Sequence, residues 1–159
     1  VSMSEVVIRP SRIEDVDDLW KYTYKGKEKK EVETLVKRYI KSYKKELRVR
    51  VVAEVEGKVI ARSRFKKKRF GLKNHIVRGW GAYVNKKYRG RGIIGEIFDF
   101  GEEWMRERGG EKIIITVRAG TVSEKVFRRR KGYKEFGRLP EGSIKDGKYW
   151  DVVYLYKNL

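Results

Sequence analysis

The segment from residue 80 to residue 108 places a basic, glycine-rich turn between an apolar run and a helical pattern. The apolar run Trp80–Val84 predicts a strand, and Arg89–Gly92 forms the turn. The helical face that follows contains Ile94, Ile97, Phe98 and Met105. The first N–H groups of a helix lack an intrahelical partner and the helix dipole favours negative charge there, while glycine lets a phosphate approach the backbone. We therefore expect a phosphorylated ligand at residues 89–95.

Two phosphate-binding motifs match this turn only in part. Gly90 and Gly95 have the spacing of a Walker A loop, but Glu96 stands where that loop needs its lysine. Together with Gly92 the same glycines match Gly-x-Gly-x-x-Gly, the dinucleotide-binding fingerprint. In that fingerprint the glycines follow the strand directly and an acidic residue ends the next strand. Here residues 85–89 intervene and the next predicted strand ends on a basic residue, so the match is weak.

A third motif fits the turn and its flanks. Arg89–Ile94 resembles the Arg/Gln-x-x-Gly-x-Gly/Ala motif of the GNAT superfamily of acyl-CoA N-acyltransferases. Ala82–Val84 resembles the fourth strand of that family and Ile113–Ala119 its fifth strand. Phe127–Tyr133 resembles the family's helix ending in Gly-Phe, and Pro10–Asp15 resembles the start of its first helix. The resemblance covers nearly the whole chain.

The resemblance implies that acetyl-CoA is the co-substrate. In the family, the N–H groups of this loop hold the pyrophosphate of coenzyme A, and the fourth strand pairs with the pantetheine arm. The residues expected to bind acetyl-CoA are Ala82, Tyr83, Val84, Arg89, Gly90, Arg91, Gly92, Ile93, Ile94, Gly95 and Thr121. Lys86 and Lys87 flank the loop and are expected to pair with the phosphates.

The catalytic positions depart from the family pattern. Where the family often has a glutamate base, an asparagine and a tyrosine acid, this chain has Thr116, Thr121 and Arg128. The loop motif also ends on Ile94 instead of a small residue, with Gly95 next to it. The catalytic residues are therefore unassigned. Arg128 is a candidate to steady the leaving thiolate by its charge, and the alternative is that it belongs to a solvated basic surface.

Composition limits the class of protein. A chain of 159 residues, 40% of them apolar, suits one domain over 1–159. The absence of cysteine excludes disulfides and thiolate metal sites, and a single histidine, His75, makes zinc catalysis a poor fit. We expect no metal, although a carboxylate-only site for a hard cation stays open. With no long apolar run and no leader pattern, we expect a soluble cytoplasmic protein and no membrane partner.

The net charge of +19 has two interpretations. Basic runs at Lys66–Arg69 and Arg128–Lys131 are compatible with nucleic-acid binding. The interpretation that we favour is a solvated surface that also attracts the coenzyme's phosphates. Charged residues make up 40% of the chain, which resembles the composition of hyperthermophile proteins.

The order of predicted elements indicates an α/β (α+β) fold with a mixed, mostly antiparallel sheet flanked by helices. Predicted strands cover 5–9, 47–55, 58–65, 75–84, 112–118, 133–137 and 149–156. Predicted helices begin at a Ser11-x-x-Glu14 capping box and cover 32–43, 91–108 and 121–131. The segment with Pro140, Gly142 and Gly147 is expected to be a loop. The resemblance implies that the fourth and fifth strands splay apart and admit the acyl-CoA.

Three functions follow from these patterns. The first is an N-acetyltransferase that moves an acetyl group from acetyl-CoA to a primary amine by direct transfer in a ternary complex. The alternative is a GNAT-fold module that binds acyl-CoA or nucleic acid with little or no catalysis. The third is an RNA-associated protein that uses the basic runs, for which binding to RNA falls as salt rises. The sequence does not identify the amine acceptor or the oligomeric state.

Overall fold

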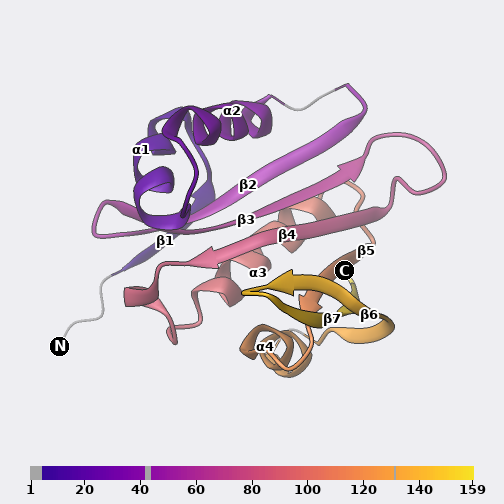
Figure 1. Cartoon of the computed structure of the whole chain (residues 1–159). Helices are drawn as coiled ribbons and strands as arrows, with labels where there is room; N and C mark the ends of the chain where they lie inside the picture. The colour runs from indigo at the N-terminus through magenta and orange to yellow at the C-terminus, as the bar shows by residue number, and fades with distance from the viewer. Residues whose placement is uncertain (1–4, 42–43, 131) are drawn as a thin grey trace.

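A computed structural model describes residues 5–41, 44–130 and 132–159. Within these ranges, seven strands form one sheet in the order β1-β2-β3-β4-β5-β7-β6 (Figure 1). Their bounds are Val6–Pro10 (β1), Glu46–Val55 (β2), Lys58–Lys68 (β3), Ile76–Val84 (β4), Lys112–Arg118 (β5), Lys134–Lys145 (β6) and Lys148–Asn158 (β7). Every neighbouring pair is antiparallel except β4 and β5, which are parallel. The predicted mixed, mostly antiparallel sheet is confirmed.

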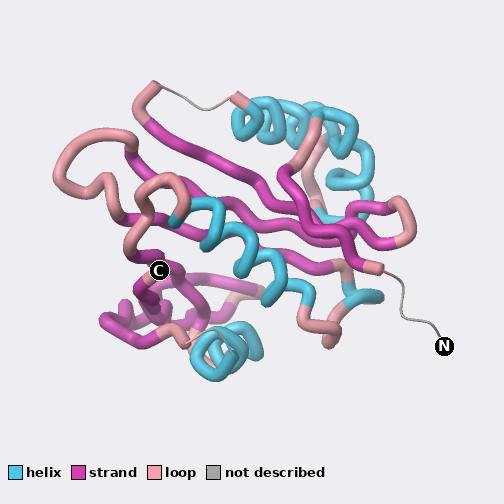
Figure 2. Tube along the Cα trace, turned by 180° about the vertical axis from the view of Figure 1, so that it is seen from behind, coloured by secondary structure: helices cyan, strands magenta, loops and turns pink. Residues whose placement is uncertain are grey.

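Helices cover both faces of this sheet (Figure 2). One face carries η1 (Ile13–Asp15), α1 (Val16–Asp18), η2 (Leu19–Thr23) and α2 (Lys29–Ile40). The other carries α3 (Ile93–Arg106), which contacts β1 to β4, and α4 (Val122–Arg130), which contacts β5. A short helix, η3 (Lys86–Tyr88), joins β4 to α3. Two hydrophobic clusters result, one under α3 and a smaller one under α1 and α2.

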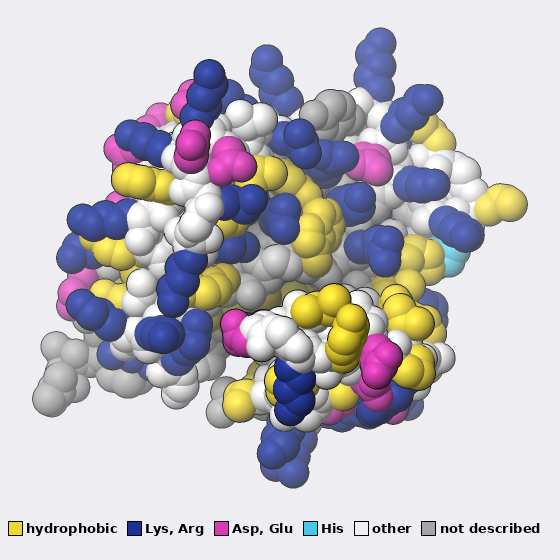
Figure 3. All heavy atoms as spheres, viewed as in Figure 1, with side chains coloured by type: hydrophobic (Ala, Val, Ile, Leu, Met, Phe, Trp, Pro, Cys, Tyr) yellow, Lys and Arg dark blue, Asp and Glu magenta, His cyan; other side chains and the backbone are white. Residues whose placement is uncertain are grey.

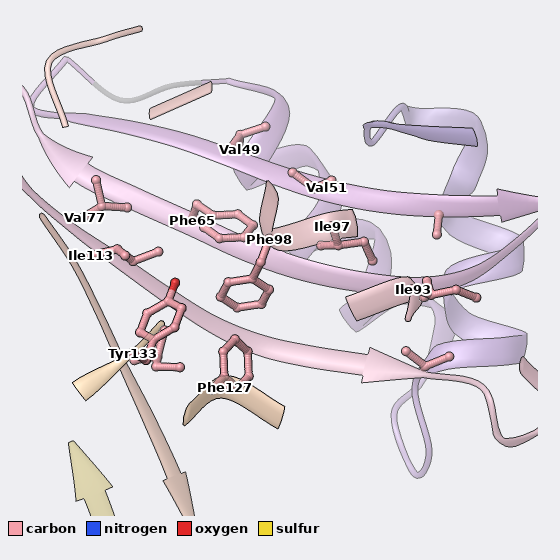
Figure 4. Packing of buried hydrophobic residues seen from close by; sticks show 14 of the residues in the cluster. Val49, Val51, Phe65, Val77, Ile93, Ile97, Phe98, Ile113, Phe127 and Tyr133 are labelled. Carbon is pink, nitrogen blue, oxygen red and sulfur yellow. The ribbon is translucent and has the colours of Figure 1, made fainter. Parts of the chain in front are cut away.

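The main cluster contains a chain of aromatic rings that ties α3 and α4 to the sheet (Figure 4). Phe98 of α3 contacts Phe65 of β3 and Phe127 of α4, with ring centroids 4.9 and 4.8 Å apart. Phe127 contacts Tyr133 at 5.2 Å. All three pairs are edge-to-face, the arrangement that ring quadrupoles favour. The helix that follows the glycine-rich turn is thus fixed to the sheet at its middle.

The predicted hairpin over residues 47–65 is confirmed, whereas the predicted loop between the last two strands is wrong. Residues 138–145 continue β6, and only Asp146-Gly147 turns the chain into β7, with φ of 53° and 72°. Leu139 pairs with Val152 and Ser143 with Trp150, so a bulge at residues 140–142 faces one residue of β7. This bulge takes Pro140, which has no N–H, out of the ladder.

The start of the first helix also differs from the prediction. The predicted Ser11-x-x-Glu14 box is displaced by one residue, because the Arg12 N–H donates to the Asp15 carboxylate at 2.8 Å. Arg9 holds that carboxylate with two further hydrogen bonds of 2.8 Å. Helix α2 begins three residues before the predicted start at Val32. Its predicted end at Tyr43, and that of α4 at Lys131, lie outside the described residues.

Candidate active site

Strands β4 and β5 separate after a short paired stretch. Ile76–Arg78 pairs with Lys112–Ile114, and no pairing between the two strands continues beyond those residues. The predicted splay of the two central strands is therefore confirmed. A cleft of about 390 Å³ opens there. Its lining residues are Gly79, Trp80, Gly81, Ala82, Phe98, Ile115, Thr116, Val117, Arg118, Thr121, Ser123, Phe127, Ser143 and Val152.

A bulge shapes the β4 wall of this cleft. The β3–β4 register shifts by one residue beside Ser63, and Gly81 adopts a φ of 70° that disfavours residues with a Cβ. Side chains of β3 hold the bulge: the Ser63 hydroxyl donates to the Trp80 carbonyl at 3.1 Å, and Arg62 Nη1 donates to the Gly81 carbonyl at 2.5 Å. On the other side, beyond Arg78, the backbone groups of β4 that point toward β5 have no strand partner among the described residues.

The glycine-rich turn lies at the end of β4. Asn85 begins η3 by accepting a hydrogen bond from the Lys87 N–H at 3.1 Å. Gly90 and Gly92 have φ of 79° and 74°, so the turn uses glycine where the backbone is left-handed. The Glu96 N–H makes the first bond within α3, to the Gly92 carbonyl at 3.2 Å. The N–H groups of residues 93–95 precede that bond and have no helical acceptor.

The side chains of the turn point in different directions. Arg89 Nε donates to the Val84 carbonyl at 2.9 Å, so this side chain closes the turn instead of reaching outward. The Arg91 guanidinium lies 5.3 Å from the Tyr88 ring. Ile93 is buried and Ile94 packs against the main cluster, which accounts for a large residue at the last position of the motif.

Thr116 and Thr121 both line the cleft, on β5 and at the start of α4. The Thr116 side chain is exposed. The Thr121 hydroxyl donates to the Arg118 carbonyl at 2.7 Å and accepts from the Glu124 N–H at 3.4 Å. Thr121 therefore caps α4 as its sequence position predicts, and its hydroxyl is already engaged on both sides.

Arg128 is engaged in ion pairs. Its Nη2 lies 3.2 Å from Glu124 and 3.0 Å from Glu135. The hydrogen bond to Glu135 outweighs the opposing effect of desolvation, and with Glu124 it raises the pKa of Arg128. Two carboxylates thus compensate the charge of this candidate, which is not among the described residues that line the cleft.

Sequence reasoning missed a group of basic side chains on the sheet face that α1 and α2 partly cover. We call this group the cationic face; its residues are Arg48, Arg50, Arg62, Arg64, Lys66 and Arg78, from β2, β3 and β4. In Figure 3, Lys and Arg side chains lie beside hydrophobic ones between the α1–α2 layer and the β6–β7 hairpin. The sequence contains a signal for this group, because basic residues occupy alternate positions at 48 and 50 and at 62, 64 and 66. Residues two apart in a strand lie on the same face of the sheet.

Two arginines of the cationic face are buried among tyrosines. Arg50 is 1% exposed and Arg62 is 8% exposed. Burial lowers the pKa of both side chains, that of Arg62 to about 10. Arg50 donates to the Tyr24 hydroxyl, and the Arg62 guanidinium lies 3.7 Å from the Tyr24 ring. Burial raises the pKa of Tyr24, but the charges of Arg50 and Arg62 outweigh that effect and lower it.

The chemistry of the cleft is limited by its lining. Among the described residues, the lining contains no carboxylate and no imidazole. Within the same described ranges there is no group of three or more His, Cys, Asp or Glu that could hold a metal ion. No helix in the described part of the chain is long and apolar enough to cross a membrane. The arrangement can bind an anion at the turn and an extended ligand along β4.

Comparison with known proteins gives a consistent picture. The sequence model of the acetyltransferase (GNAT) family matches residues 13–133. An N-acetyltransferase from Staphylococcus aureus Mu50 is similar, with a TM-score of 0.81 at 17% identity, over 98% of this chain and 99% of that one. So is a ribosomal-protein-alanine N-acetyltransferase from Brucella melitensis, with a TM-score of 0.79 at 22% identity over 96% and 99%.

A putative acetyltransferase from Salmonella typhimurium, solved with its cofactor acetyl-CoA, has a TM-score of 0.78 at 13% identity, over 98% of this chain and 94% of that one. At these identities the structures establish a shared fold. Among curated protein sequences, none matches this chain.

Proposed function

This chain belongs to the GNAT family of acetyltransferases, and on that premise we propose that it moves an acetyl group from acetyl-CoA to a primary amine by direct transfer in a ternary complex. The observation that carries the proposal is the cleft between β4 and β5, whose lining extends along β4 from Gly79 to Ala82, on the strand that leads into the glycine-rich turn. Strand β4 thus has an open cleft along its length and an anion site at its end.

The coenzyme fits this arrangement in one direction. Its pyrophosphate accepts hydrogen bonds from the free N–H groups at the start of α3, where the helix dipole also favours negative charge. Gly90 and Gly92 allow that approach. The pantetheine arm then runs along Ala82–Val84, whose backbone groups facing β5 have no strand partner in the described part of the chain. Lys86 and Lys87 are exposed beside the turn and supply further charge for the phosphates.

The transfer itself needs little from side chains. The neutral amine attacks the thioester carbonyl carbon and forms the C–N bond of a tetrahedral intermediate. The C–S bond of this intermediate then breaks and releases the coenzyme thiolate. A β4 backbone N–H stabilises the oxyanion that forms in between. With no carboxylate or imidazole among the described lining residues, water accepts the proton of the amine. Thr116, where the family often has a base, has a hydroxyl that remains protonated near neutral pH.

The test is thiol release from acetyl-CoA in the presence of single amines, with the N-acetylated product identified by mass spectrometry. We expect stoichiometric thiol and acetylated amine for at least one primary amine. Thiol release without an acetylated product would mean hydrolysis and would contradict the proposal.

The second candidate is a GNAT-fold module that binds acetyl-CoA without efficient catalysis. The residues that favour it are Thr116 and Arg128, which replace the base and acid that the family often uses. Under that alternative, calorimetry detects acetyl-CoA binding while no amine on a broad panel is acetylated.

A further inference from the structure

We propose that the acceptor amine carries an anionic group, a carboxylate or a phosphonate, and that Lys66 and Arg78 of the cationic face bind it. The inference rests on the proposed function and names the acceptor class that this site takes. Three observations support it: a pocket lined by Lys66 and Arg78, the absence of salt bridges to these two side chains within the described residues, and the residues that the pocket shares with the cleft between β4 and β5.

The pocket lies on the cationic face and has a volume of about 300 Å³. Its lining residues are Lys66, Arg78, Gly79, Trp80, Ile114, Ile115 and Thr116. Four of these, Gly79, Trp80, Ile115 and Thr116, also line the cleft between β4 and β5. A short molecule can therefore place an amine at the cleft and an anionic end beside Lys66 and Arg78. Pockets of this size suit small ligands.

The basic side chains on this part of the cationic face are not held in salt bridges to described residues, although the charge of Lys66 acts at longer range on the Glu46 carboxylate. Within the described residues, no carboxylate forms a salt bridge with Arg64, Lys66 or Arg78. Arg48, the next basic residue on β2, is paired with Glu46. Side by side on adjacent strands, Lys66 and Arg78 face each other in the register. Like charges on two paired residues repel, and an anion bound by both side chains relieves the repulsion and gains charge-assisted hydrogen bonds.

The same face of the sheet holds further donors that lack a hydrogen-bond partner among the described residues. Arg50 and Arg64 are cross-strand neighbours, and Arg64 in turn is opposite Trp80. Arg50 Nε and Nη2 and Arg64 Nε are buried and make no hydrogen bond to any residue that the structure describes. A buried guanidinium without a counterion is costly, so the face as a whole favours an incoming negative charge. Arg62 has another task, since its N–H groups hold Thr23 and the Gly81 carbonyl.

Trp80 connects the charge to the cleft. Its ring lies 5.0 Å from the Arg64 guanidinium and 5.2 Å from Lys66 Nζ. These cation–π contacts hold the indole as a wall shared by the pocket and the cleft.

The cationic face also accounts for proton loss from the acceptor. A nearby positive charge disfavours an ammonium ion and therefore lowers the pKa of a bound amine. A purely cationic acceptor is repelled by this face, whereas an anionic substituent bound at Lys66 and Arg78 anchors the molecule while its amine becomes neutral. No side-chain base is then required at Thr116.

The first experiment compares acceptors that differ only in the anion. Thiol release is measured with β-alanine, 2-aminoethylphosphonate and propylamine, and each kcat/KM is corrected for the neutral fraction of the amine. We expect the two anionic amines to exceed propylamine by at least about tenfold, the effect of one charge-assisted contact. Equal or better turnover of propylamine would overturn the inference while leaving the acetyltransferase proposal intact.

The second experiment tests whether Lys66 and Arg78 cause the preference for anionic amines. In Lys66→Gln with Arg78→Gln we expect the preference for the anionic amines to fall about tenfold, with the KM for acetyl-CoA unchanged. Lys30→Gln with Arg38→Gln is the matched control, because it also removes two positive charges, from exposed positions of α2. A preference that survives in the variant of Lys66 and Arg78, or that falls equally in the control, contradicts the assignment.

A binding measurement is independent of turnover. Calorimetry with 3-phosphonopropionate, which has no amine, should give a Kd about tenfold weaker for the variant of Lys66 and Arg78 than for the wild type. If the wild type binds this compound and no amine is acetylated, the anion site stands and the acetyltransferase proposal fails. If amines are acetylated and 3-phosphonopropionate binds equally to both proteins, the anion site is wrong.

Discussion

Gly92 precedes the first residue of α3, where we propose that the pyrophosphate binds. Its φ of 74° strains any residue with a Cβ, so one substitution cannot separate strain from charge. We therefore compare Gly92→Gln with Gly92→Glu, which have the same shape. Acetyl-CoA binding, measured by calorimetry, should weaken about tenfold in the first and a further roughly tenfold or more in the second, because the glutamate repels the pyrophosphate. The same Kd in both variants would contradict an anion site here.

Arg128 is expected to contribute little to turnover. Its charge is matched by Glu124 and Glu135 and it does not line the cleft as described. Exposed ion pairs contribute little, so kcat/KM of Arg128→Ala should stay within about twofold of the wild type. A larger loss that Arg128→Lys restores would reinstate the role expected from its sequence position, which is support of the thiolate by charge.

At the scale of elements, the approach of α3 to the sheet depends on Gly101. A Cβ built at this residue lies 2.4 Å from the Phe65 ring. Gly101→Ala should therefore lower the free energy of unfolding by about 1–3 kcal/mol, because overpacking exceeds the gain in helix propensity. Urea denaturation measures this. In a protein that already carries Phe65→Leu, Gly101→Ala should lower the free energy of unfolding by less. An equal loss with Phe65 and with Leu at that position would mean that contact with the Phe65 ring does not cause the destabilisation.

The contact between α3 and Tyr133, which precedes β6, predicts a pH dependence. Tyr133 is buried and donates to Glu102 at 3.1 Å. Burial first, and the charge of Glu102 second, raise the pKa of Tyr133 above its usual range. Above pH about 10 the Tyr133 hydroxyl loses its proton in the unfolded chain but keeps it in the folded one. The free energy of unfolding therefore has its full value below that pH and decreases above it, by up to about 1.4 kcal/mol per pH unit.

Tyr133→Phe removes the titrating hydroxyl, so the free energy of unfolding should decrease less steeply with pH in this variant. The measurement is urea denaturation of both proteins between pH about 9 and about 11, where ordinary tyrosines titrate. The other tyrosines are common to both proteins, so the difference between the two curves isolates Tyr133. Parallel curves would show that its proton is not linked to folding.

At the scale of the whole molecule, local patterns predicted most of the sheet, the glycine-rich turn and the helix that follows it. They failed at Pro140, where a bulge that forms only against β7 keeps a proline within a strand. They also failed for Arg50 and Arg62, because a sequence does not reveal that Tyr24, which follows η2, and Tyr39 of α2 will cover basic side chains. The confirmed splay came from the family resemblance, since no local pattern encodes the end of a strand pairing.

The net charge of +19 is not spread evenly over a solvated surface. In the run Lys66–Arg69, strand β3 directs Lys66 to the pocket on the cationic face. Lys67 is 6% exposed, and its ammonium donates to the carbonyls of Lys68 and Asn74. Part of the charge that is compatible with nucleic-acid binding is therefore used within the fold or beside the cleft.

The most direct test of the coenzyme site is a crystal structure of the protein with acetyl-CoA. We predict that the pyrophosphate accepts hydrogen bonds from N–H groups of residues 90–95, and that the pantetheine lies along Ala82–Val84. The acetyl group should lie between the bulge at Gly81 and Thr116. A coenzyme bound elsewhere, such as on the basic segment 66–74, with the cleft between β4 and β5 empty, would contradict the account.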